Sequence, residues 1–322
     1  MKNIWLSGVM AAGLALLAVA MLSSAPVLRT AAAAAKVHTE YAEPVPEQEP
    51  ERRIQSFVVH QAAQHRHDEG IPLTVRIDGA DRQMTLSEYL CGVLLGEMPA
   101  DFPTEALKAQ AVAARTYTMH TLESGGALSD DPSTCQAYRD PSEAPERLEK
   151  IRQAVLETDG EVLTYDGTLI TATYFSCSGG RTESAQAVWG SSVPYLLSVE
   201  SPGEDTEKAS SCVTMDREDF MNRLGIEDSE IGETTYTEGG GVDTMVIGGE
   251  TFSGTELRRK LDLRSTDFSL EVSGDTVTAD VRGFGHRVGL SQYGAKAMAE
   301  SGSDYREILA WYYTGAELTE AV

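Results

Sequence analysis

One uninterrupted helical run constrains the fold more than any other feature of this chain. From Thr104 to Ser124 the sequence is rich in alanine and contains no glycine or proline, which predicts a long helix beginning near Thr104. A second helix is expected just before it, from Leu86 to Gly96, and Pro99 and Pro103 bracket the turn between the two. The spacing therefore places the carboxylate of Glu97 at the junction of two helices.

The long helix carries polar side chains in an otherwise apolar run. Lys108 and Arg115 are seven residues apart and share one face, whereas Gln110 lies about 200° around the helix from Lys108. These three side chains are candidates for binding a polar substrate near Glu97. The alternative is that Lys108 and Arg115 form a solvated stripe and that Glu97 is a surface acid.

A glycine-rich loop lies near the C-terminus, between a strand predicted at Thr276 to Val281 and a helix predicted at Ala295 to Ser301. Four glycines occur within the twelve residues 283–294, so the backbone can come close to a ligand or adopt positive φ. The loop groups neutral hydrogen-bonding side chains suited to a sugar. The candidate binding residues here are His286, Gln292 and Tyr293.

Another turn follows a strand predicted at Leu169 to Phe175, and it contains the sequence Ser-Cys-Ser-Gly-Gly. Aromatic residues follow it, at Trp189 and Tyr195, and such side chains can stack on pyranose faces or simply belong to the core. The candidate binding residues of this region are Ser176, Gly179, Gly180 and Tyr195.

These three segments together resemble the stage II sporulation protein D family, which also contains the amidase-enhancer proteins of bacterial walls. The family has a Glu-Met-Pro ahead of an Ala-Leu-Lys-Ala-Gln-Ala-Val-Ala-Ala-Arg-Thr-Tyr helix, a Ser-Gly-Gly turn before a Trp and a Pro-Tyr, and a Gly-His-Gly-Val-Gly-Met-Ser-Gln-Tyr-Gly-Ala loop. All three patterns occur here in that order, and the likeness covers about Leu73 to Thr319. The first and last are too long to arise by chance from composition.

The resemblance implies a lytic transglycosylase that acts on peptidoglycan without a cofactor, with Glu97 as the catalytic glutamate and Arg115 as a substrate-binding residue. One carboxylate is enough for this chemistry, because the C6 hydroxyl of N-acetylmuramic acid (MurNAc) supplies the attacking oxygen, whereas a hydrolase normally needs a second acid. Glu97 would need a raised pKa to protonate the bond between MurNAc and N-acetylglucosamine (GlcNAc). The product would carry a 1,6-anhydro-MurNAc end.

The C-terminal loop departs from the family pattern at two positions. Leu290 stands where the family has Met, which nearly conserves volume, and Arg287 stands where the family has Gly. Because a side chain now projects at position 287, both the shape that this loop gives to a binding groove and the role of His286 are in question. For His286, a hydrogen bond that shapes the groove is favoured over a role as general base.

Composition bounds the remaining possibilities. The net charge of −24 argues against a nucleic-acid partner. Nineteen residues without a charge, Ile4 to Leu22, are enough to span a hydrocarbon core of about 30 Å, so residues 1–30 are expected to be a membrane anchor or a signal segment, the anchor being favoured. An acidic, proline-rich linker is expected over 31–70 and the catalytic domain over 71–322. We therefore expect a single-pass protein of the cell membrane whose catalytic domain lies outside the cytoplasm.

The second half of this domain predicts an α+β fold with a second lobe at about 214–282. Helices are expected at Arg217 to Leu224 and Thr255 to Leu261, and a further strand at Phe268 to Val272, with no βαβ rhythm. The substrate groove is expected between the two lobes, with Glu97 on one side and His286 on the other.

The four cysteines, Cys91, Cys135, Cys177 and Cys212, permit three pairings. Free buried thiols are the main expectation, and a Cys135–Cys212 disulfide is an alternative. Some clostridial relatives carry a zinc-type His and two Cys ahead of Gln-Ala-Tyr, but here only Cys135-Gln136-Ala137-Tyr138 matches, so no metal is expected.

Other chemical readings of the chain are weaker. A histidine group at His60, His65 and His67 lacks the ligand spacing of a metal site, and a Cys177/His286 peptidase would need the two side chains to meet. A different class remains open, which is a non-catalytic wall-binding protein that enhances an amidase. By the same resemblance, the expected partners are peptidoglycan strands, a sporulation amidase and a membrane scaffold protein.

Overall fold

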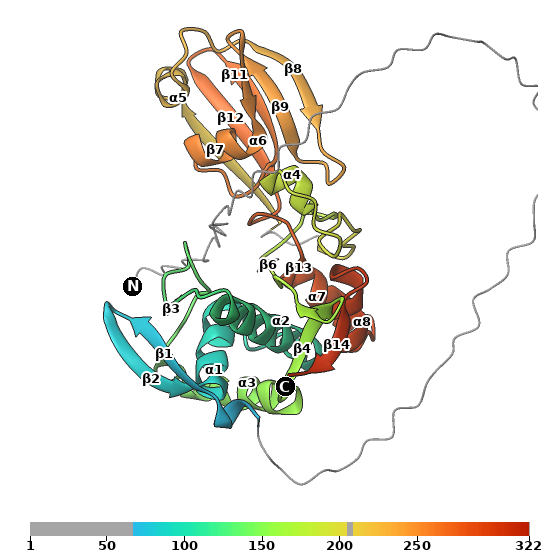
Figure 1. The fold of residues 1–322 in the computed structure, drawn as a ribbon. Helices are drawn as coiled ribbons and strands as arrows, with labels where there is room; N and C mark the ends of the chain where they lie inside the picture. Colours follow the sequence, from blue (N-terminus) through green and yellow to red (C-terminus); the bar gives the residue numbers. More distant parts are fainter. Residues whose placement is uncertain (1–66, 205–208, 322) are drawn as a thin grey trace, which may run out of the picture. The chain divides into compact units, whose positions relative to one another are not determined.

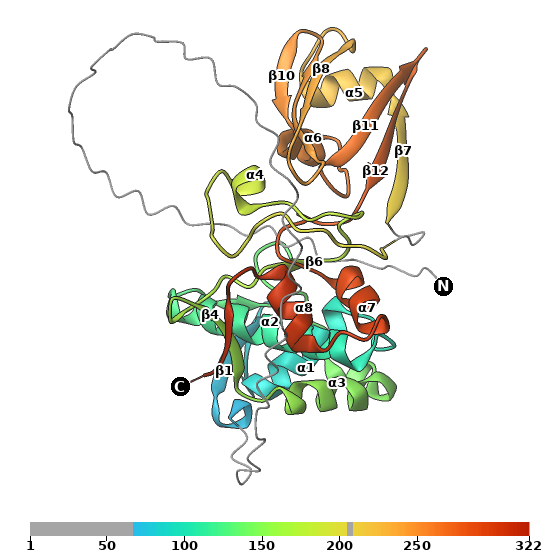
Figure 2. The same ribbon diagram turned by 90° about the vertical axis from the view of Figure 1, so that its right-hand side faces the viewer.

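The computed structural model describes residues 67–204 and 209–321, and it confirms an α+β fold (Figures 1 and 2). The expected membrane anchor and most of the expected linker lie outside the described residues. Within the described part, no helix has the length and apolar character needed to cross a membrane.

The centre of the first hydrophobic cluster is helix α2 (Thr104–Glu123), which contacts α1 (Leu86–Glu97), α3 (Pro145–Glu157), α7 (Gln292–Glu300) and α8 (Tyr305–Tyr312) (Figure 1). Alanine on several sides of α2 lets these helices approach it closely. Thr85 and Glu88 form a capping box that begins α1 at the predicted residue.

Short strands complete the first cluster. A sheet of order β2-β1-β3 contains β1 (Pro72–Ile77), β2 (Ala80–Thr85) and β3 (Leu128–Ser129). A second sheet, of order β14-β4-β5, is built from β14 (Glu317–Glu320), β4 (Glu161–Tyr165) and β5 (Thr168–Leu169). The shorter elements are η1 (Asp68–Gly70), η2 (Pro141–Glu143) and α4 (Ala185–Trp189).

The strand predicted over Leu169 to Phe175 is broken in two. Its first part is β5, and its last part is β6 (Tyr174–Phe175), which pairs in parallel with β13 (Leu290–Ser291). Between them the backbone leaves the sheet, and the N–H of Thr171 donates to the hydroxyl of Tyr195 at 3.1 Å. The β6–β13 pair brings the two glycine-containing motifs side by side.

A second hydrophobic cluster lies within residues 213–281, close to the range expected for a second lobe. One antiparallel sheet joins β11 (Asp267–Ser273), β12 (Thr276–Arg282) and β7 (Ser210–Asp216). Another joins β10 (Glu250–Ser253), β9 (Val242–Ile247) and β8 (Ile231–Tyr236). Helices α5 (Arg217–Leu224) and α6 (Gly254–Lys260) agree with their predicted ranges to within one residue. Strands β8 to β10 were not predicted, because the glycines at 239–241 and 248–249, which lie in the turns between them, indicated a turn-rich segment.

The folded unit begins earlier than the expected boundary at residue 71. Asp68 falls in the range expected to be linker, yet it is 1% exposed and accepts a 2.7 Å bond from the guanidinium of Arg115. The backbone N–H groups of His67 and Asp68 also donate to the carboxylate of Asp159. A fragment that starts at Leu73 would leave Arg115 buried without its carboxylate.

The substitution Asp68→Asn tests this assignment. Removing one partner of a buried pair should lower the free energy of unfolding by about 3–5 kcal/mol, because Arg115 stays buried and charged. Asp81→Asn is the matched control, since Asp81 and its partner Arg76 are both more than half exposed, and it should cost less than about 1 kcal/mol. Urea denaturation measures both values, and equal losses in the two variants would contradict the assignment.

Candidate active site around Glu97

Glu97 is the last residue of α1, and three separate parts of the chain hold its carboxylate. Oε1 accepts a 2.6 Å hydrogen bond from the backbone N–H of Ala137, and Oε2 accepts from Nε2 of Gln292 at 3.4 Å. Gln292 is the first residue of α7, which begins three residues earlier than predicted because Ser291 caps it. The side chain of Glu97 is half-buried, so solvent retains access to the site.

Burial raises the pKa of Glu97 from 4.5 to about 7. Hydrogen bonds from Ala137, Gln292 and Tyr174 act in the opposite direction, since they stabilise the ionised form, but they are smaller than the effect of burial. The result is a carboxyl group that is largely protonated just below neutral pH and has stabilising partners ready when it ionises. This is the property that a general acid needs.

A buried polar chain supports the Ala137 side of the site. The amide of Gln136 donates to the hydroxyl of Thr118 at 2.8 Å and accepts from the hydroxyl of Tyr174 at 2.8 Å. Gln136 is fully buried, and these bonds fix the backbone beside Ala137. These residues were missed as site residues. The sequence did single out the Cys-Gln-Ala-Tyr segment, but as the remnant of a zinc site.

His286 contacts the backbone of β6 and is neutral. The N–H of Val288 donates to Nδ1 at 3.1 Å, so the proton is on Nε2, which donates to the carbonyl of Tyr174 at 3.1 Å. Burial, with the charge of Arg258, lowers the pKa of His286 to about 3. Both ring nitrogens are thus engaged by backbone, which fits a shaping role and leaves neither nitrogen available as a base.

The Ser-Cys-Ser-Gly-Gly turn points its donors at a buried carboxylate. Oε2 of Glu204, which is 3% exposed, accepts from the N–H of Ser178 at 2.5 Å and from the N–H of Gly179 at 3.0 Å. The N–H of Gly180 donates to the hydroxyl of Ser178, and the carbonyl of Ser176 accepts from the N–H of Tyr293 at 3.0 Å. The expectation that Ser176, Gly179 and Gly180 bind a sugar therefore gains no support, because these contacts are internal.

The thiol of Cys177 donates to the same Glu204 carboxylate at 3.0 Å. Burial, reinforced by the negative charge of Glu204, raises the pKa of this thiol far above its usual range. A protonated thiol is a poor nucleophile, so a Cys177/His286 peptidase does not fit the structure.

All four cysteines are free. Cys91, Cys135 and Cys177 are buried, but Cys212 is exposed on β7, so neither the expected burial of Cys212 nor the alternative Cys135–Cys212 disulfide is correct. Among the residues that the structure describes, no three His, Cys, Asp or Glu side chains are grouped as metal ligands. His60 and His65 lie outside those residues. Nδ1 of His67 lies 3.7 Å from the carboxylate of Asp68.

Lys108 and Arg115 share a face of α2 as predicted, but that face is packed against α3. Lys108 pairs with Glu157 at 2.6 Å, and the fully buried Arg115 donates to the carbonyl of Val155 and to Asp68. The expectation that Arg115 binds substrate is therefore not supported, because its guanidinium is enclosed by protein. Sequence spacing gave the correct face but could not show what covers it.

Two further candidates, Gln110 and Tyr195, do not present free side chains to a substrate: one is buried, and the other contacts residues of the same fold. Gln110 is 0% exposed, and neither of its side-chain polar atoms has a hydrogen-bond partner within the described part of the chain. Tyr195 packs against Tyr165 and accepts the Thr171 hydrogen bond. Of the predicted set, Gln292 is the residue whose side chain contacts Glu97.

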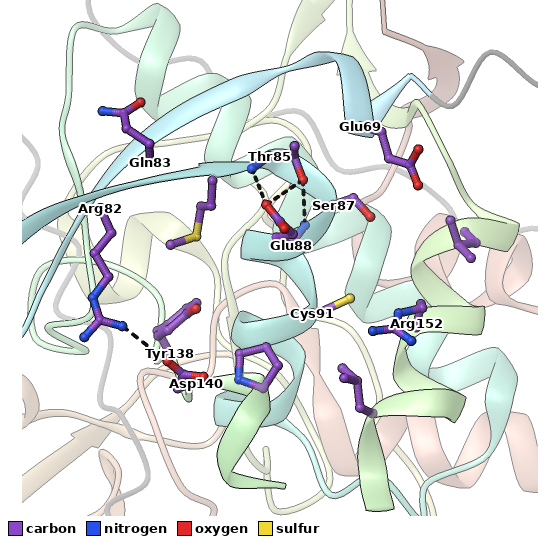
Figure 3. Close-up of a pocket in the computed structure, with 14 residues that line it drawn as sticks. Glu69, Arg82, Gln83, Thr85, Ser87, Glu88, Cys91, Tyr138, Asp140 and Arg152 are labelled. Carbon is purple, nitrogen blue, oxygen red and sulfur yellow. Dashed lines mark hydrogen bonds and ion pairs between the residues drawn. The ribbon is translucent and has the colours of Figure 1, made fainter. Parts of the chain in front are cut away.

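A cavity of about 750 Å³ lies at the other end of α1, between the β1–β2 hairpin and α3 (Figure 3). Its polar groups are largely engaged with one another: Glu88 caps α1 with Thr85, and Arg82 donates to Asp140 at 3.2 Å. The cavity contains none of the predicted site residues.

Comparison with known proteins agrees with the motifs. The family model described as stage II sporulation protein matches residues 79–165. The chain is 40% identical over 271 residues to stage II sporulation protein D of Bacillus subtilis, covering 78% of this chain and 79% of the relative. This chain belongs to the stage II sporulation protein D family.

Two further relatives are similar to this chain. Stage II sporulation protein D of Bacillus amyloliquefaciens is 40% identical over 73% of this chain and 74% of its own length. A protein of B. subtilis named amidase enhancer is 32% identical over 71% of this chain, which corresponds to 40% of that longer relative.

Arg287, which departs from the glycine of the family pattern, is 1% exposed and has a left-handed φ of 65°. Its guanidinium donates to the carbonyls of Ser178 and Gly239 and lies 3.3 Å from Glu183. Glu183 also accepts from the N–H of Gly241. The side chain thus ties the 176–183 region to the loop between β8 and β9, and these bonds compensate for the unfavourable backbone conformation.

Arg287→Gly should relieve about 1 kcal/mol of backbone strain but leave the buried Glu183 without its counter-charge, so the protein should lose about 2–4 kcal/mol of stability. Adding Glu183→Gln should restore at least half of that loss, because the uncompensated charge is gone. Urea unfolding of the three variants measures the effect. A more stable Arg287→Gly variant would contradict this role.

Proposed function

We propose that this protein is a lytic transglycosylase that cleaves the MurNAc–GlcNAc bond of peptidoglycan. The observation that carries the proposal is the half-buried Glu97, whose pKa is about 7 and which accepts hydrogen bonds from Ala137 and Gln292. Membership of the family and the position of Glu97 in its Glu-Met-Pro motif support the same reading.

The reaction requires one carboxyl group to act twice. Protonated Glu97 gives its proton to the glycosidic oxygen, the bond to C1 of MurNAc breaks, and the GlcNAc end leaves as an alcohol. The ionised carboxylate then accepts the proton of the C6 hydroxyl, whose oxygen bonds to C1 and closes the 1,6-anhydro ring. No water is consumed, and Glu97 returns to its protonated state.

The surroundings of Glu97 suit both steps. Burial keeps the carboxyl protonated for the first step, and the N–H of Ala137 and the amide of Gln292 stabilise the negative charge after it. A carboxyl with an ordinary pKa would be ionised at neutral pH and could not serve as the acid. A much more deeply buried one would be a weak acid and would release its proton too slowly.

We also propose a biological setting, which the names of the relatives support. Their names refer to sporulation and to enhancement of an amidase, so we place the reaction in cell-wall remodelling during engulfment, on glycan whose stem peptides an amidase has removed. An amidase and a membrane scaffold are the proposed partners, and the proposed location is the outer side of the cell membrane.

A second candidate function is non-catalytic enhancement of an amidase, which the 32% identical amidase enhancer favours. In that case the protein would bind glycan and leave it intact. Analysis of the products separates the two functions directly.

Glu97→Gln should abolish release of 1,6-anhydro products from amidase-treated peptidoglycan, because an amide cannot donate the proton. Mass spectrometry of the soluble products measures this. The control is Glu123→Gln at the exposed end of α2, which should retain full activity. Reducing-end sugars from the wild-type protein would indicate a hydrolase, and bound but uncut glycan would favour the enhancer.

The pH profile should report the ionisation of Glu97. Since the protonated form is active and its pKa is about 7, kcat/KM should be constant below about pH 6 and fall about tenfold per pH unit above about pH 8. Gln292→Ala removes a bond that lowers the pKa, so it should move the midpoint to higher pH. A midpoint near 4.5 in the wild-type protein would contradict the acid role.

A further inference from the structure

A cavity of about 680 Å³ is lined by residues that lie close to Glu97 and Gln292 in the sequence. Pro99 and Ala100, the second and third residues after Glu97, line it on one side, and Tyr293, which follows Gln292, lines it on the other. The cavity is therefore connected through the chain to both elements that hold the carboxyl. Nothing in the proposed proton transfers uses it.

The cavity has one more cationic than acidic side chain in a strongly negative protein, and one of its cations, Arg147, pairs with Glu146 at 3.6 Å. Arg147 and Lys150 from α3 and Lys296 from α7 line it, against two acids, Asp101 and Glu146, although the whole chain has a net charge of −24. A local excess of cations on such a chain favours an anionic ligand.

Each lysine is positioned but retains donor capacity. Nζ of Lys150 donates to the carbonyl of Phe102, and Nζ of Lys296 lies 2.7 Å from Glu300, which is half exposed. An ammonium has three donors, and these contacts account for one on each lysine within the described part of the chain. Each lysine therefore has donors left for a carboxylate that enters the cavity.

Two of the side chains that line the cavity are aromatic and pack against each other. The rings of Phe102 and Tyr293 meet edge to face, with centroids 5.1 Å apart and an interplanar angle of 79°. Phe102 is 3% exposed, and Nζ of Lys296 lies 6.0 Å from the centre of its ring. Aromatic rings and cations in one lining suit a small group that ends in a carboxylate, bound beside a sugar ring.

We propose that this cavity binds the free lactyl carboxylate of a MurNAc residue next to the bond that Glu97 cleaves. The inference rests on the proposed function, since it assigns one part of that substrate to named residues. In intact peptidoglycan the lactyl group is joined to the stem peptide as a neutral amide, so the cavity selects glycan that carries the free acid. Lys150 and Lys296 are the specificity-determining residues.

The test measures binding in a Glu97→Gln background, so that cleavage does not consume the ligand. The ligands are peptide-free glycan strands and the same strands after the lactyl carboxylates are converted to methylamides. The free-acid strands should bind about fivefold to tenfold more tightly at low salt, the size expected for hydrogen bonds to a charged group. Added salt should reduce the difference.

Variants then locate the effect. Lys150→Met and Lys296→Met should each weaken binding of the free acid and leave the methylamide unchanged. Glu300→Gln removes the acid that competes for Lys296 and should tighten binding of the free acid, a gain that misfolding cannot produce. The matched control is Lys260→Met, because Lys260 also pairs with a glutamate four residues away and lies 5.9 Å from the ring of Phe252.

The outcomes separate the two proposals. Equal affinity for the two strand forms, or no binding of either, would overturn the carboxylate site. So would an unchanged preference in both lysine variants. Absence of 1,6-anhydro products from the protein with Glu97 intact would instead overturn the proposed reaction, and the binding comparison would still report on the cavity.

Discussion

The structure around the candidate site depends on one arrangement, the carboxyl of Glu97 held between the N–H of Ala137 and the amide of Gln292. The three residues come from the end of α1, the segment after β3 and the start of α7. Their convergence half-buries the carboxyl and raises its pKa, while the two donors limit the shift. In the proposed reaction, packing of α1 and α7 against α2 would let this single glutamate act as an acid and, after ionisation, as a base.

Other charged groups in the family motifs serve the fold. Arg115 is buried against Asp68, and Glu204 collects the donors of the Ser-Cys-Ser-Gly-Gly turn. Arg287 with Glu183 joins that turn to the loop between β8 and β9. Removing the partner of any of these buried charges would be costly, and none of the charges is accessible to a ligand. The motifs therefore contain residues that stabilise the fold as well as the candidate catalytic residue.

The sequence predicted the helices well, because α2 has no helix breaker and the Thr85 capping box fixes the start of α1. It also placed Glu97 correctly at a helix junction. Sequence-based prediction failed for properties that depend on tertiary contacts. Periodicity showed that Lys108 and Arg115 share a face but not that α3 covers it, and a neutral His286 follows only from its two backbone partners. The contact of Ala137 with Glu97 spans 40 residues, and no local pattern encodes it.

The central claim is that the fold itself keeps Glu97 protonated near neutral pH. The most direct test is a carboxyl titration by carbon-detected NMR with labelled glutamate, in which the Glu97 signal is identified by its absence from the Glu97→Gln variant. The account predicts a midpoint near pH 7 in the free protein. A midpoint near 4.5, the ordinary value for a glutamate, would contradict it and would leave the site without its acid.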